Sequence, residues 1–176
     1  MLIGARGSGK STVAAALAAR LGWTCVDTDA LIEARAGTTI RAIFERLGEA
    51  EFRRIEAAIV DEVCGGSGQV ISVGGGAVLS DRNRAALRRA GPCVWLTASA
   101  ETLAARIEAD PRTAQTRPPL TARAGIEEVR YLLAQRGPLY AELASLTIDT
   151  TNRSAVGVAD AIRAALAAGS PRVEDV

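Results

Sequence analysis

Short apolar runs alternate along the chain with longer segments in which apolar residues recur every three or four positions. Runs of this length are typical of buried strands, whereas the longer period is that of one face of a helix. The runs that we expect to form strands are 2–3, 24–26, 69–73, 93–96 and 146–149. The segments that we expect to form helices are 13–21, 30–47, 50–64, 81–90, 99–109, 125–145 and 155–168. The alternation predicts an α/β fold, a five-stranded parallel sheet with helices on both faces.

The length of 176 residues predicts a single domain, which we place at residues 1–168. Residues 110–123 hold three prolines and three arginines between two predicted helices, and they are too polar for the core and too long for a simple turn. We expect this segment to act as a mobile lid. Residues 169–176 follow the last predicted helix, and we expect them to form a flexible tail.

The composition of the chain argues against nucleic acid and membranes as binding partners. The net charge of +1 and the aromatic content of 3% offer neither a basic surface nor a stacking platform for nucleic acid. No apolar run approaches the ~18 residues of a membrane span. The three cysteines are odd in number and widely spaced, which argues against a disulfide framework and fits a reducing cytoplasm. We expect a cytoplasmic protein without nucleic-acid or membrane partners, and we expect a monomer.

The chain contains no histidine. This excludes imidazole metal ligands, nucleophile triads that depend on histidine, and acid–base catalysis by imidazole. Carboxylates remain as the candidate general bases.

A phosphate-binding motif follows the first predicted strand. Residues 4–11 read Gly-Ala-Arg-Gly-Ser-Gly-Lys-Ser, the pattern G-x-x-x-x-G-K-[ST]. Its glycines let backbone N–H groups turn toward a phosphate, and the helix that follows adds positive potential. Lys10, the single lysine among 21 basic residues, would reach the β- and γ-phosphates, and the Ser11 hydroxyl would ligate Mg²⁺. The residues expected to hold a nucleoside triphosphate are Gly7, Ser8, Gly9, Lys10, Ser11 and Thr12.

Two carboxylates, Asp27 and Asp29, follow the second predicted strand. In an extended chain they would point the same way, toward the phosphate site beyond the sheet edge. One could meet Mg²⁺ and the other a substrate hydroxyl. The alternative for Asp29 is that it caps the next helix, because Asp is a preferred residue at that position.

Two further motifs come from a predicted helix and from the third strand. Arg53 and Glu56 are three residues apart and share a helix face, where an ordinary surface ion pair is the alternative to a ligand site. Residues 74–76 are three glycines that directly follow the third strand. They form either a loose turn or a place where backbone N–H groups approach a ligand closely, and we favour the second interpretation.

Arg117 and Arg136 are each followed by prolines that stiffen the backbone. A rigidly placed guanidinium suits a carboxylate or a phosphate, which it can bind through two parallel hydrogen bonds. The alternative for either residue is a solvated arginine.

Taken in order, these motifs resemble those of the shikimate kinases of the aromatic amino-acid pathway, through essentially the whole chain. The motifs are 4–12, Asp27-Thr28-Asp29, 52–56, 74–76, Arg117-Pro118, and Arg136 with 138–140. The first is shared by many nucleotide-binding proteins, whereas the others together are specific. The resemblance implies a P-loop NTPase fold of the nucleoside monophosphate kinase type with a lid. It also implies ATP-dependent phosphorylation of the shikimate 3-hydroxyl, which gives shikimate 3-phosphate and ADP.

The resemblance also implies roles for individual residues. Shikimate would be held by Asp29, Arg53, Gly75, Gly76 and Arg136, with the two arginines on its carboxylate and Asp29 on its hydroxyls. Asp27 would lie near Mg²⁺ and the attacking hydroxyl. Arg117 would be the lid arginine that closes over the phosphates, so that Lys10, Asp27 and Arg117 form the catalytic set. Arg106 and Arg153 would flank the adenine.

Two alternatives stay open at this point. The chain could be another small kinase of the same build that acts on gluconate or a nucleoside monophosphate, although the two arginines and the Asp-x-Asp motif disfavour it. It could also be a nucleotide-binding regulator without turnover, which the full set of Lys10, Ser11, Asp27 and Arg117 disfavours.

Overall fold

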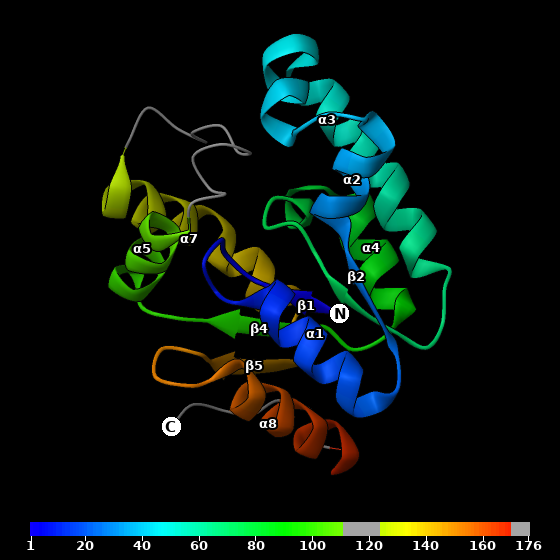
Figure 1. The fold of residues 1–176 in the computed structure, drawn as a ribbon, viewed down its shortest axis with the longest axis vertical. Helices are drawn as coiled ribbons and strands as arrows, with labels where there is room; N and C mark the ends of the chain where they lie inside the picture. The colour runs from blue at the N-terminus through cyan, green and yellow to red at the C-terminus, as the bar shows by residue number, and fades with distance from the viewer. Residues whose placement is uncertain (111–123, 170–176) are drawn as a thin grey trace.

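The computed structural model describes residues 1–110 and 124–169 of the chain. Its centre is a five-stranded parallel sheet with the strand order β2-β3-β1-β4-β5 (Figure 1). The strands are β1 (Leu2–Ile3), β2 (Thr24–Asp27), β3 (Gln69–Ser72), β4 (Val94–Thr97) and β5 (Leu146–Asp149). The predicted sheet and its parallel strands are therefore confirmed.

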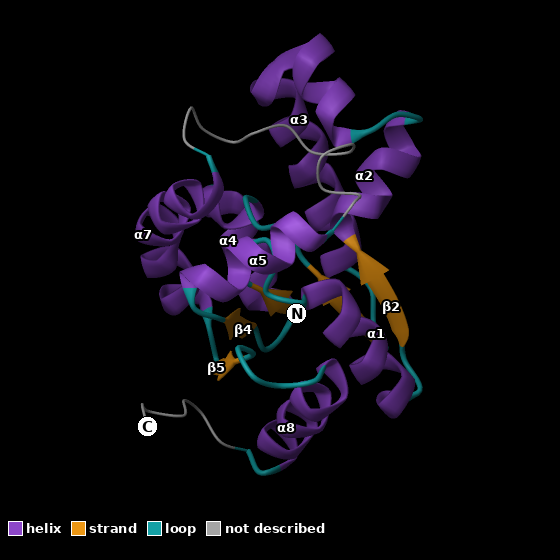
Figure 2. Cartoon of the chain, turned by 60° about the vertical axis from the view of Figure 1, so that its left-hand side comes forward, coloured by secondary structure: helices purple, strands orange, loops and turns teal. Residues whose placement is uncertain are grey.

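Helices cover both faces of this sheet (Figure 2). They are α1 (Lys10–Leu21), α2 (Thr28–Ala36), α3 (Ile40–Cys64), α4 (Asp81–Ala90), α5 (Ala100–Ala109), α7 (Gly125–Leu143) and α8 (Ala155–Ala167), with a short 3₁₀ helix, η1 (Ala77–Leu79). Helices α1 and α8 pack against each other over one face of the sheet. Helices α3, α4 and α7 bury their apolar residues with the other face.

The central strand β1 shows how the sheet separates two cores. Leu2 pairs with Ser72 of β3 and with Val94 of β4, so that β1 has a parallel neighbour on each side. Successive side chains of a strand point to opposite faces. Leu2 therefore joins the core under α1 and α8, whereas Ile3 joins the core under α3 and α7.

The break between the second and third helices differs from the prediction. We expected it near position 48, whereas α2 ends at residue 36, where Gly37 adopts the left-handed conformation. Thr39 then begins α3, because its side chain accepts a hydrogen bond from the Ala42 N–H. Gly48 has a φ of 79° and interrupts α3 without ending it. A glycine within a helical pattern thus marks a kink here rather than a terminus.

The carboxyl ends of β1, β2 and β3 meet at one edge of the sheet, because these strands are parallel neighbours. The motifs that follow them must therefore converge. The predicted lid lies outside the described residues except for Asp110, and so does the predicted tail except for Gly169. Within the described ranges, no helix combines the length and the apolar character that crossing a membrane requires.

Candidate active site

The phosphate loop is held close to the sheet and to α5 by glycines. Gly4 has a φ of 140°, and a Cβ at this position would collide with the backbone carbonyl of Leu96 in β4. Gly7 has a φ of 79°, and its Cβ would lie 2.9 Å from the carbonyl oxygen of Leu103 in α5. The loop conformation therefore needs glycine both for its backbone angles and for space.

Lys10 is the first residue of α1, and Gly9 precedes it as the N-cap. The Lys10 ammonium donates a hydrogen bond to the backbone carbonyl of Ala5 at 2.8 Å, across the loop. The N–H groups of the first turn of α1 have no partner within the helix, and together with the lysine they favour an anion at this end of the helix.

Ser11 and Asp27 form the oxygen-rich part of the site. The Ser11 hydroxyl donates to Asp27 Oδ2 at 2.6 Å, and the Ser72 hydroxyl lies 3.4 Å from Ser11 Oγ. These are the hard oxygen donors that suit Mg²⁺, which usually takes one or two protein ligands and completes its shell with phosphate oxygens and water. Among the described residues, no group of three or more histidine, cysteine or acidic side chains could hold a metal by itself.

The expected extended geometry of Asp27 and Asp29 is wrong. Asp27 is the last residue of β2, and its other carboxylate oxygen accepts hydrogen bonds from the Asp29 and Ala30 N–H groups, so that it caps α2. Asp29 lies in the first turn of α2. Asp27, rather than Asp29, is therefore the helix cap, because α2 begins at Thr28, two residues before the predicted start at position 30.

Two cavities open beside these residues. The larger cavity is lined by the phosphate loop and the residues around it, namely Arg6, Gly7, Gly9, Lys10, Ser11, Thr12, Asp27, Asp29, Ala30, Glu33, Ile40, Ser72, Val73, Arg106, Ile107 and Asp110. The smaller cavity lies beyond the loop and is lined by Arg6, Asp29, Ile40, Phe44, Phe52, Arg53, Glu56, Gly75, Gly76 and Arg136. Three arginines, two carboxylates and two aromatic rings thus surround the smaller cavity.

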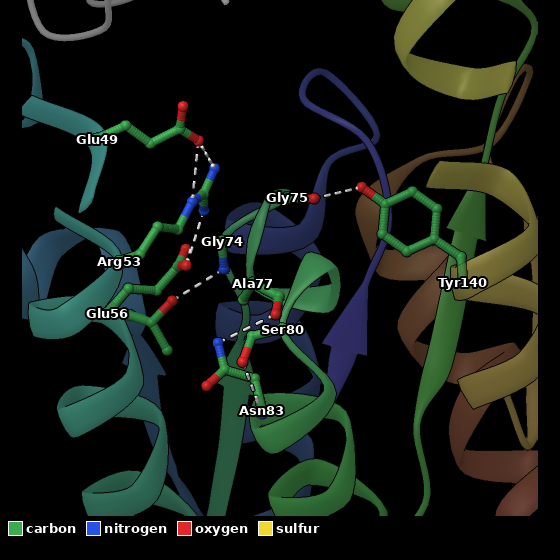
Figure 3. Close-up of polar contacts among 10 residues, drawn as sticks. Glu49, Arg53, Glu56, Gly74, Gly75, Ala77, Ser80, Asn83 and Tyr140 are labelled. Atoms are coloured by element: carbon green, nitrogen blue, oxygen red, sulfur yellow. Dashed lines mark hydrogen bonds and ion pairs between the residues drawn. The ribbon is translucent and has the colours of Figure 1, made fainter. Parts of the chain in front are cut away.

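Arg53 of the smaller cavity is held by carboxylates from its own helix (Figure 3). Its Nη1 donates to Glu56 Oε2 at 2.7 Å, and its Nη2 donates to Glu49 Oε1 at 3.1 Å. The Glu56 side chain is only 2% exposed, which excludes the ordinary surface ion pair. Burial raises the pKa of Glu56 despite the opposing charge of Arg53. Burial lowers the pKa of Arg53, but the charges and hydrogen bonds of Glu56 and Glu49 outweigh it and raise that pKa.

The glycines after β3 fit closely between other parts of the site (Figure 3). The Gly74 N–H donates to the hydroxyl of buried Thr28 at 2.8 Å, and a Cβ at Gly74 would lie 2.5 Å from Asp29 Oδ1. A Cβ at Gly76 would lie 2.6 Å from Arg53 Nη1. The absence of side chains here lets an aspartate and an arginine approach the backbone.

Tyr140 holds the same loop from the opposite side. It is fully buried in α7, and its hydroxyl donates to the Gly75 carbonyl at 2.6 Å (Figure 3). Burial raises the pKa of Tyr140 to about 12, against the opposing effect of Arg136 one helical turn away. The tyrosine is therefore a neutral hydrogen-bond donor across the physiological pH range.

The shikimate kinase family model matches residues 6–167 of the chain. The chain belongs to the shikimate kinase family. A shikimate kinase of Symbiobacterium thermophilum is 46% identical over 154 residues, which cover 88% of this chain and 87% of that protein. A shikimate kinase of Oleidesulfovibrio alaskensis is 42% identical over 168 residues, or 96% of this chain and 97% of that protein.

A solved structure of a shikimate kinase agrees in fold as well. The enzyme from Acinetobacter baumannii, in complex with shikimate, superposes with a TM-score of 0.90 at 34% identity. The match covers 97% of this chain and 93% of that chain. The expected P-loop kinase architecture and family membership are both confirmed.

The structure brings most of the predicted site residues of this shikimate kinase family member to the two cavities. Ser8 is the exception in the phosphate loop, because its hydroxyl is buried and it lines neither cavity. Arg106 reaches the larger cavity while donating to the backbone carbonyls of Thr150 and Gly7. Arg153 is exposed and lines neither cavity, and Arg117 lies outside the described residues.

Several residues of the site, some of them within the matched motifs, received no role in the sequence interpretation. Thr28 and Tyr140 contact the glycine loop from distant segments, and no local pattern marks such contacts. Phe44 and Phe52 line the smaller cavity and also pack on each other with ring centroids 4.6 Å apart. Helical spacing assigned Phe52 to the core, and it does belong to the core while it also lines the cavity.

Proposed function

We propose that this protein transfers the γ-phosphoryl group of ATP to the 3-hydroxyl of shikimate, which gives shikimate 3-phosphate and ADP. The observation that carries the proposal is the pair of adjoining cavities, one lined by a phosphate loop and the other by arginines around a buried carboxylate. Such a pair suits a phosphoryl donor and a small anionic acceptor. Membership of the shikimate kinase family supports this choice of acceptor.

On the donor side, Lys10 binds the β- and γ-phosphates together with the N–H groups of the loop and of the first turn of α1. This role is supported by the position of its ammonium, which lies across the loop at the Ala5 carbonyl. Ser11 and Asp27 would hold Mg²⁺, which neutralises phosphate charge when it is bound. Arg106 contacts the nucleotide from α5, and we assign Arg153 and Arg117 to the adenine and to the phosphates, respectively.

On the acceptor side, Arg53 and Arg136 bind the shikimate carboxylate, and Asp29 accepts hydrogen bonds from its hydroxyls. The smaller cavity is lined by two carboxylates, which repel an anionic acceptor. The positive charge of the arginines in the same cavity offsets this repulsion. Glu56 keeps the Arg53 guanidinium oriented toward the cavity. Gly75 and Gly76 line this cavity, and the lack of a side chain at Gly76 leaves room for the Arg53 guanidinium.

Catalysis in this proposal depends on placement and charge. Phosphoryl transfer passes through a loose transition state whose charge is spread over the moving group, so that cations around that group lower the barrier. Asp27 orients the attacking hydroxyl and accepts its proton, because the chain has no histidine to do so. The Ser11 hydroxyl at 2.6 Å keeps the Asp27 carboxylate in place.

A coupled assay of ADP release tests the proposal. We expect turnover with MgATP and shikimate, and little or none with quinate, gluconate or nucleoside monophosphates. Product identity is checked by mass spectrometry of the phosphorylated acceptor. Release of ADP with gluconate or a monophosphate but not with shikimate would reject the assignment, and nucleotide binding without any turnover would indicate a regulator.

A further inference from the structure

Three residues, Arg6, Asp29 and Ile40, line both cavities. They mark the junction through which a phosphoryl group must pass if the donor occupies one cavity and the acceptor the other. Arg6 is the cation of this set and belongs to the phosphate loop itself. The pattern G-x-x-x-x-G-K-[ST] leaves this position open, so the motif assigns it no role.

The packing of the loop fixes the position of Arg6. A Cβ at Gly75 would lie 3.3 Å from the Gly4 carbonyl oxygen and 3.7 Å from the Arg6 backbone nitrogen, so the two loops are in contact at this point. Figure 3 shows the blue phosphate-loop ribbon passing beside Gly75. On the other side, Gly7 lies against α5 without space for a side chain. Arg6 is half-buried between these contacts, and its backbone cannot move away from the junction without displacing the loop.

The other cations of the two cavities each line only one of them. Arg53 is bound by Glu49 and Glu56 of its own helix. Arg106 is bound by backbone carbonyls at the nucleotide end of the larger cavity. These two arginines line one cavity each.

We propose that Arg6 is a catalytic residue that binds the equatorial oxygens of the phosphoryl group during its transfer between the two cavities. The inference rests on the proposed function. In the step, the acceptor hydroxyl oxygen forms a bond to the γ-phosphorus while the bond from that phosphorus to the β–γ bridging oxygen breaks. The hydroxyl proton goes to Asp27, and ADP leaves with the bridging oxygen. A planar guanidinium can donate two parallel hydrogen bonds to the oxygens of the moving group.

The test compares Arg6→Met and Arg6→Lys with the parent protein. Arg82→Met is the control, because Arg82 is an exposed arginine that pairs with Asp61 and lines neither cavity. We expect Arg6→Met to lower kcat by about 10²-fold, whereas KM for ATP and for shikimate changes by less than about threefold. Arg6→Lys should recover only part of the loss, and Arg82→Met should match the parent.

A second readout does not need turnover. Fluoroaluminate with MgADP and shikimate mimics the transferring group, and its binding is measured by calorimetry in the parent and in each variant. We expect Arg6→Met to weaken this complex by about as much as it lowers kcat, and to leave the affinity for MgADP alone nearly unchanged. Unchanged MgADP affinity also shows that the variant is folded.

The outcomes separate this inference from the proposed function. An inactive parent protein would reject the function itself. If the parent is active and Arg6→Met has the parental kcat, the role of Arg6 is overturned. If Arg6→Met does not fold, a parental kcat in Arg6→Lys overturns it instead. A raised shikimate KM at unchanged kcat would overturn it as well, because Arg6 would then bind the acceptor carboxylate rather than the moving phosphoryl group.

Discussion

Glu56 is a buried carboxylate that has no direct part in phosphoryl transfer. Its side chain contacts Arg53, and the charges of Asp29 and Arg136 also act on it. Burial raises its pKa above the ordinary value of 4.5. Removing one partner of such an ion pair leaves the other charge uncompensated, so that buried Glu56 and half-buried Arg53 each depend on the charge of the other.

The raised pKa of Glu56 has a consequence for stability. Because the folded protein binds the proton more tightly than the unfolded chain, folding takes up a proton at pH values from about 4.5 up to the raised pKa. The contribution of Glu56 to the free energy of unfolding therefore falls as pH rises through this window. As pH rises through this range, we expect the free energy of unfolding of Glu56→Gln to increase relative to that of the parent. Urea unfolding at several pH values measures both free energies. A difference that does not vary with pH would show that the pKa of Glu56 is not raised.

At the residue scale, the sequence indicates residues of local motifs, but it does not indicate contacts between residues that are far apart in the chain. Lys10 and Ser11 belong to a motif whose geometry is local, and both line the larger cavity. Thr28 and Tyr140 act through partners that are 46 and 65 positions away in the chain. Only the packing of the sheet brings such residues together, and no periodicity encodes it.

At the scale of elements, the loops depend on glycines in two different ways. Gly4 and Gly91 have nearly the same φ, 140° and 142°, yet a Cβ at Gly4 meets the Leu96 carbonyl whereas a Cβ at Gly91 meets nothing within 4 Å. An alanine at Gly91 would therefore be unfavourable only because of the backbone angle, whereas an alanine at Gly4 would also collide with a neighbouring strand.

We expect Gly91→Ala to cost about 1–3 kcal/mol through backbone strain. Gly4→Ala should cost more than about 3 kcal/mol, because the strand that carries Leu96 must also move. Urea unfolding of both variants measures the difference. Equal costs would mean that the close approach of the phosphate loop to β4 does not limit the residue at position 4.

Gly76 tests the fit of the glycine loop against Arg53. Its Cβ would meet the guanidinium of Arg53, which must shift and weaken its ion pair with buried Glu56, so that Gly76→Ala should cost about 1–3 kcal/mol of stability. The shikimate KM should rise at least about tenfold, because the guanidinium leaves its place. Gly65→Ala is the matched control, because Gly65 has nearly the same φ and ψ as Gly76 and lies outside the cavities. A parental shikimate KM in Gly76→Ala would contradict the close fit.

The existence of each described strand and of each described helix except η1 follows from the apolar pattern, but the boundary between α2 and α3 does not. Residues 30–47 look like one helix because Ala, Leu and Arg favour helix throughout. The left-handed Gly37 and the Thr39 cap divide them, and a capping hydrogen bond outweighs small differences in helix propensity. The start of α2 differs from the prediction for a related reason, because the Asp27 side chain caps the helix at Thr28, two residues before the predicted start.

At the scale of the whole molecule, the two cavities should respond to ligands separately. With shikimate or MgADP at about one hundred times its Kd, each ligand should stabilise the protein by about 2.7 kcal/mol, or roughly 5–10 °C in Tm. Arg53→Ala should remove the shift caused by shikimate and keep that caused by MgADP, and Lys10→Ala should do the reverse. Differential scanning fluorimetry measures both shifts. Loss of both shifts in either variant would contradict the division of the ligands between the cavities.

The predominance of arginine gives Lys10 a further property. Every other basic side chain of the protein is a guanidinium, so that the molecule carries one side-chain amine, and that amine lies in the phosphate loop. An amine-selective acylating reagent thus has a single side-chain target in this 176-residue chain, and peptide mapping distinguishes it from the α-amine of Met1. Its reaction rate reports directly on the phosphate loop, since a nucleotide that covers Lys10 would shield the amine. Lys10 is therefore a natural labelling site whose acylation rate measures nucleotide occupancy, and no residue has to be engineered for this purpose.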